Sequence, residues 1–60
     1  MSRDKLNALL AFAVETNSMS LLYTTRIALG RDGVTAEEQQ QAIGSCAAQV
    51  EMLALMGTSL

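Results

Sequence analysis

Apolar side chains recur every three or four positions over the second half of the chain, which is the spacing of a helix that buries one face. The repeat is regular between residues 36 and 56 and forms one stripe. Its members are Ile43, Cys46, Ala47, Val50, Leu53 and Ala54. The pattern predicts an amphipathic helix over residues 36–56.

The first half of the chain shows helical spacing over residues 3–29, with no proline or glycine to interrupt it. Its apolar residues occupy several faces. One face holds Leu6, Leu9 and Leu10, a second holds Phe12, Met19 and Tyr23 at spacings of seven and four, and a third includes Leu21. A helix that is apolar around most of its circumference is buried on most sides. We therefore predict one continuous helix over residues 3–29 with more than one neighbour.

Local signals mark where the helices begin and end. Thr35 and Glu38 have the spacing of a capping box, in which each side chain satisfies the backbone amide of the other residue. Gly30 and Gly57 each follow a helical stretch and suit the left-handed residue just past a helix end. The turn over residues 30–34 is short, so the two helices should be antiparallel. The predicted fold is all-α, a two-helix antiparallel hairpin.

Composition adds the expectation of a partner chain. Half of the 60 residues are apolar and 17% are charged, which is too apolar for a disordered chain. A domain of this size buries only about 60% of the surface of its unfolded chain. One hairpin has a single seam, so we expect two copies to form a four-helix bundle. The predicted core and dimer residues are Leu6, Leu9, Leu10, Leu21, Ile43, Cys46, Val50 and Leu53.

Two apolar groups are candidate surfaces for binding another protein. The first contains the only Phe and the only Tyr of the chain, and the second lies at the end of the second helix, off its main stripe. Aromatic and Met side chains are enriched at binding hot spots and adaptable surfaces. The same side chains would also serve as the core of a homodimer or seal the end of a bundle. The candidate partner-binding residues are Phe12, Met19, Leu22, Tyr23, Met52, Leu55 and Met56.

The sequence offers no cluster of residues for catalysis or metal binding. It contains no His, and Cys46 is the only cysteine, so a zinc site of four Cys or His ligands is excluded, as is a Cys–His pair. Glu37 and Glu38 are explained by the start of a helix, and Glu15 and Glu51 are isolated. We therefore expect no enzymatic activity, no cofactor, no metal and no small-molecule substrate.

Charge and hydropathy argue against nucleic acid and membranes as partners. The net charge is −2, and the four basic residues are scattered, whereas a nucleic-acid binder needs a basic stripe. The layout is similar to that of small dimeric RNA-binding hairpins from plasmids, but the basic face of those proteins is missing. The first apolar run, over residues 6–14, is too short to span a membrane. Asp4 lies between the basic residues that precede this run, which is not typical of a signal peptide. We expect a cytoplasmic protein with a reduced thiol.

These expectations favour a non-enzymatic interaction protein that docks an apolar helix face on another protein. Dimeric regulators, inhibitors and adaptors, including the short host-directed proteins of phages, belong to this class. Two alternatives stay open. One is a compact helical dimer that regulates nucleic acid, which requires Arg3, Lys5, Arg26 and Arg31 to be gathered on one face. The other is a structural subunit or chaperone of a larger assembly.

Overall fold

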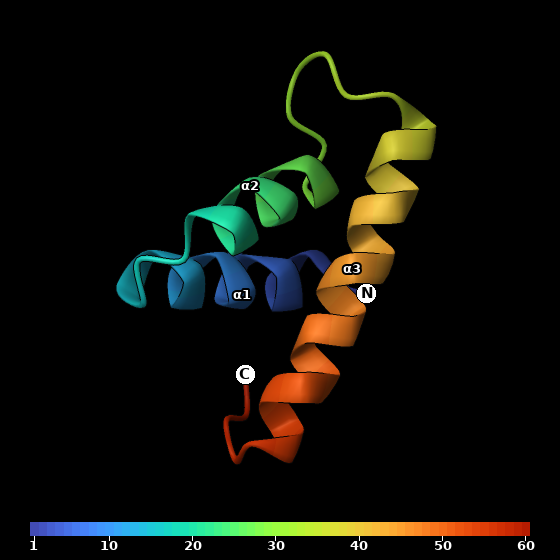
Figure 1. Cartoon of the computed structure of the whole chain (residues 1–60). Coiled ribbons are helices and arrows are strands. Elements are labelled where there is room, and N and C mark those ends of the chain that lie inside the picture. Colours follow the sequence, from blue (N-terminus) through green and yellow to red (C-terminus); the bar gives the residue numbers. More distant parts are fainter.

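The computed structural model describes residues 1–60 and contains three α-helices and no strand. Helix α1 spans Arg3–Glu15, α2 spans Met19–Ala28 and α3 spans Ala36–Leu55 (Figure 1). α1 and α2 run beside each other in opposite directions, and α3 lies crosswise to them and extends beyond them at its C-terminal end (Figure 1). α2 packs extensively against both other helices, whereas α1 and α3 meet at few points. The prediction of an all-α fold is confirmed.

The continuous helix predicted over residues 3–29 is wrong, because the chain reverses direction at Asn17. Asn17 has a φ of 56°, in the left-handed region. The Ser18 amide donates to the Ala13 carbonyl at 2.9 Å, and the Asn17 amide donates to the Val14 carbonyl at 3.2 Å. This pair of bonds is a Schellman motif, which ends a helix and satisfies its last carbonyls. The fold therefore has three helices, and the predicted two-helix hairpin is replaced by a hairpin of α1 and α2 with α3 across it.

The second reversal and the two ends of α3 follow the signals in the sequence. Gly30 has a φ of 85°, and Gly57, just past α3, has a φ of 90°. The Glu38 amide donates to the Thr35 hydroxyl at 3.1 Å, and the Thr35 amide donates to the Glu38 carboxylate at 2.9 Å. Both halves of the predicted capping box are therefore present, and α3 begins at the residue that follows Thr35.

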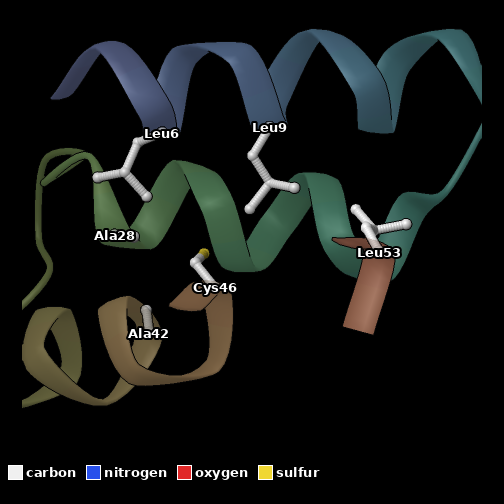
Figure 2. Packing of buried hydrophobic residues seen from close by; sticks show 6 residues of the cluster. All are labelled: Leu6, Leu9, Ala28, Ala42, Cys46 and Leu53. Atoms are coloured by element: carbon white, nitrogen blue, oxygen red, sulfur yellow. The ribbon is translucent and has the colours of Figure 1, made fainter. Parts of the chain in front are cut away.

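The core lies where the three helices meet, and every helix contributes to it (Figure 2). Its buried side chains are Leu6 and Leu9 from α1, Ala28 from α2, and Ala42, Cys46 and Leu53 from α3. These residues are buried within a single chain. A single chain buries this cluster by itself, and dimerisation into a four-helix bundle stays a prediction.

The remaining predicted core residues lie at the margin of this cluster. Leu21, Ile43 and Val50 are half-buried and pack against it, and Leu10 is half-buried as well. Ala47 and Ala54, which the apolar repeat placed on the buried stripe, are exposed. The buried side of α3 is thus narrower than the repeat suggested.

Candidate interaction surfaces

One side of α2 presents apolar side chains to solvent. Met19 and Tyr23 are one helical turn apart and are 54% and 51% exposed. Arg26 follows within the next turn and is also exposed. The helical spacing places these three residues opposite Thr25 and Ala28, which are buried. We call Met19, Tyr23 and Arg26 the α2 face.

Two further residues of the first candidate surface lie elsewhere. Phe12 belongs to α1, on the other side of the reversal at Asn17, and it is half-buried against the core. The spacing of seven that aligned it with Met19 applies only to an unbroken helix. Leu22 is half-buried on α2. The structure therefore keeps only Met19 and Tyr23 of the predicted group on one exposed face.

The C-terminal turns of α3 expose large apolar side chains. Met52 is 56% exposed and Leu55 is 85% exposed, while Leu53 between them is buried. Met56, the residue that caps the helix, is 75% exposed. These are the three residues that the sequence placed off the main stripe, and the structure puts all three in solvent.

The earlier turns of α3 are also open on the side of Leu55, but their side chains are small. Gly44, Ala47 and Ala48 are exposed. A Cβ atom built at Gly44 would meet no other atom within 4 Å. The apolar side chains on the outer side of α3 are thus small in the middle of the helix and large at its C-terminal end. We call this strip the α3 outer face, made of Gly44, Ala47, Ala48, Glu51, Met52 and Leu55.

Cys46 is a buried thiol in a structural setting. Its Sγ lies 3.9 Å from the Thr25 hydroxyl oxygen, to which it donates, and the Thr25 hydroxyl donates to the Leu21 carbonyl at 2.6 Å. Burial raises the pKa of the Cys46 thiol, and the bond to Thr25 opposes this shift only in part. Because the thiolate is the reactive form, a raised pKa makes Cys46 a poor nucleophile.

Thr25 is the residue of the interior that sequence reasoning missed. Its side chain is fully buried although it is polar. A hydroxyl that bonds to the carbonyl one turn earlier carries its own partner into the core, so the residue packs almost like Val. The three- and four-residue spacing from Leu21 to Thr25 and Ala28 is the signal that could have identified it.

A shallow hollow of about 210 Å³ lies between the start of α2 and the middle of α3. Its lining is Ser18, Ser20, Leu21, Thr24, Ser45 and Gln49. None of these side chains is charged, so the hollow offers no general acid or base. The chain also has no group of three or more His, Cys, Asp or Glu side chains that could hold a metal ion.

Three of the four basic residues lie at one end of the molecule. The Arg3 guanidinium donates to the carbonyl of Leu29, the residue that caps α2, at 3.3 Å. Arg26 is in the last turn of α2, and Arg31 follows just after it. Arg3 is followed by Asp4, and Arg31 is followed by Asp32. These aspartates lower the net positive charge of this end.

Lys5 lies apart from the arginines, because its ammonium donates to the Leu60 main-chain oxygen at 2.6 Å and fastens the end of the chain to α1.

Comparison with known protein families, curated proteins and solved structures gives no match. None of the three helices combines the length and apolar content needed to cross a membrane. The exposed surfaces of the three helices are therefore the basis for inferring a function.

Proposed function

We propose that this protein is a small non-enzymatic protein-binding module. It forms a homodimer and acts as a regulator, inhibitor or adaptor by docking an apolar helix face on another protein. The observation that carries the proposal is the α2 face, where Met19 and Tyr23 are half exposed on adjacent turns. The proposal assigns the protein to the cytoplasm, where its single thiol stays reduced.

The α2 face has the composition and the support of a binding surface. Tyr and Arg are enriched among the residues that dominate binding energy, and Met adapts its shape to a partner. The opposite side of α2 is fixed by Thr25 and Ala28 in the core, so the exposed side chains are presented on a rigid element. Fully burying one large apolar side chain contributes about 1.5–3 kcal/mol. The side chains of the α2 face contribute this free energy only when a partner covers them.

Affinity capture from the native cell, followed by binding measurements with the purified partner, tests this surface. We expect Tyr23→Ala to weaken binding about 30-fold, the effect of losing a hot-spot residue worth about 2 kcal/mol. Met19→Ala should weaken it by a smaller factor. Val14→Ala is the matched control, because Val14 is a 62% exposed apolar residue of α1 outside the α2 face.

Circular dichroism should show unchanged helicity in all three variants. Unaltered partner binding by both Tyr23→Ala and Met19→Ala would remove the α2 face from the proposal.

A second candidate function, nucleic-acid binding by a compact dimer, is favoured only by the arginines at one end. Phosphate contacts make such binding steeply dependent on salt. A mobility shift at low salt that disappears in Arg26→Gln and Arg31→Gln would support this function. No shift at low salt would reject it.

A further inference from the structure

We infer that residues 57–60 form a latch that fastens the C-terminal end of α3 to α1, and that the latch opens and closes while the three helices stay folded. After the last turn of α3 the chain turns back toward α1 (Figure 1). The closed latch covers part of the core, and the open latch uncovers it. The latch is a property of one chain and does not depend on the proposed binding function.

Three contacts hold the latch closed. The Thr58 amide donates to the Leu53 carbonyl at 2.8 Å, which starts the return of the chain. The Lys5 ammonium donates to the Leu60 main-chain oxygen at 2.6 Å, and this hydrogen bond is partly buried. The Leu60 side chain is half-buried and packs against the core cluster. These contacts give residues 57–60 a defined position although no helix includes them.

Gly57 is the hinge of the latch. Its φ of 90° lies in the left-handed region, which residues with a side chain rarely adopt. A Cβ atom built on Gly57 would meet no other atom within 4 Å, so the backbone angle, and not crowding, is what favours glycine here. Gly57 is exposed, and a change of its backbone angles therefore disturbs no packed side chain.

The latch links two helices that otherwise meet at few points, because α2 packs against both α1 and α3. The C-terminal part of α3 extends beyond α1 and α2 (Figure 1). Over residues 49–55 only Leu53 is buried. The hydrogen bond from Lys5 is therefore a second attachment for this end of α3, on the helix that touches it least.

The contacts are few enough for the latch to open by itself. Fixing the backbone of four residues costs conformational entropy at each of them. One charge-assisted hydrogen bond, one backbone hydrogen bond and one half-buried Leu side chain offset this cost. The fully buried residues Leu9 and Cys46 belong to the helices themselves. Segments with few buried contacts open at a lower free energy than the whole fold, so we expect local opening.

Opening the latch enlarges the apolar surface at the end of α3. Leu55 and Met56, which come directly before the hinge, are already exposed. Displacement of Leu60 adds the part of the core that this side chain covers. The state of the latch therefore determines how much apolar surface the C-terminal end of α3 presents.

NMR relaxation of the full chain tests the closed state. In the wild type we expect backbone order parameters of about 0.8 at Ser59 and Leu60, close to those of a rigid helix. Lys5→Met keeps an unbranched apolar stem but removes the ammonium, so it should lower both values below about 0.6. Cys46, in the middle of α3, should keep the same value in both proteins.

Two further variants serve as a second test and a control. Leu60→Ser removes the apolar contact and should lower the order parameters of residues 59 and 60 as Lys5→Met does. Arg31→Met removes an exposed positive charge from the turn before α3 and should leave them unchanged.

Binding of the dye anilinonaphthalene sulfonate reports the surface that the latch covers, because the dye binds exposed apolar surface. Leu60→Ser removes an apolar side chain from the latch, so any increase in dye fluorescence must come from the uncovered core. We expect an increase of at least about twofold. Circular dichroism should show unchanged helicity, since the helices stay folded.

Four results would overturn the inference. Order parameters below about 0.6 at residues 59 and 60 of the wild type would show that the latch is not closed. Unchanged values in both Lys5→Met and Leu60→Ser would show that these contacts do not hold it. An equal loss of order at Leu60 and Cys46 would show that it opens only with the whole fold. Unchanged dye fluorescence in Leu60→Ser would show that it covers no apolar surface.

Discussion

The two sides of α3 share one backbone and differ completely in what covers them. The inner side places Cys46 and Leu53 against α1 and α2, where they are buried. The outer side presents Gly44 and Leu55 to solvent. The fold of one chain explains the inner residues and gives no reason for an apolar residue as large as Leu55 on the outer side. Substitutions on the inner side are therefore expected to change the stability of the fold far more than substitutions on the outer side.

Truncating Leu53 and Leu55 in turn is the most direct test of this division. Leu53→Ala should lower the free energy of unfolding by about 2–5 kcal/mol, because it opens a cavity in the core. Leu55→Ala, two residues away, should change it by less than about 0.5 kcal/mol when measured on the monomer. Urea denaturation at low protein concentration gives both values. Similar effects at the two positions would contradict the division.

The polar pair on the inner side should have a smaller effect. Thr25→Val keeps the shape of the side chain but removes the hydroxyl that donates to the Leu21 carbonyl and accepts from Cys46. We expect a loss of about 1 kcal/mol in the free energy of unfolding. A double-mutant cycle with Cys46→Ala measures how much of this comes from the contact between the two side chains. A stabilised Thr25→Val variant would show that the hydroxyl is tolerated rather than used.

The smallest effect on stability should come from the capping box at the start of α3. The hydrogen bonds from Thr35, first its amide and then its side chain, lower the pKa of Glu38 below its ordinary value of 4.5. A lowered pKa in the folded state means that the ionised carboxylate stabilises the fold above pH 4.5. This stabilisation is lost as the pH falls through the lowered value.

We therefore expect the thermal midpoint of the wild type to fall slightly more than that of Glu38→Gln between pH 7 and pH 3. Glu51→Gln, which removes a carboxylate without a capping role, is the control for the loss of charge alone. If the thermal midpoints of the wild type and Glu38→Gln change with pH in the same way, the capping carboxylate does not cause the loss of stability at low pH.

The two chain reversals show what the sequence could predict about the fold. Gly30 and Asn17 both occupy the left-handed position after a helix, but only the glycine predicts a helix end by its residue type alone. Asn is the other residue that often takes this position, and here it stands between Thr16 and Ser18. Apolar spacing continues across the reversal and hides it, because the residues on both sides pack into the same core.

The surfaces show a similar limit. Met52, Leu55 and Met56 could be placed from periodicity alone, since α3 is unbroken and they lie off its stripe. Phe12 could not, because its relation to Met19 depended on a helix that ends between them. The exposure of Gly44 depends on which side of α3 the other helices leave uncovered. Periodicity alone does not report that.

The position of α2 between its two sequence neighbours has a consequence for the rate at which the chain folds. Nearly all packing joins helices adjacent along the chain, and α1 and α3 meet at few points. Contacts of short sequence separation need little loop closure, so folding should be complete within microseconds to milliseconds. The chain contains no proline, so no slow isomerisation phase should follow. Temperature-jump relaxation should therefore show one fast process.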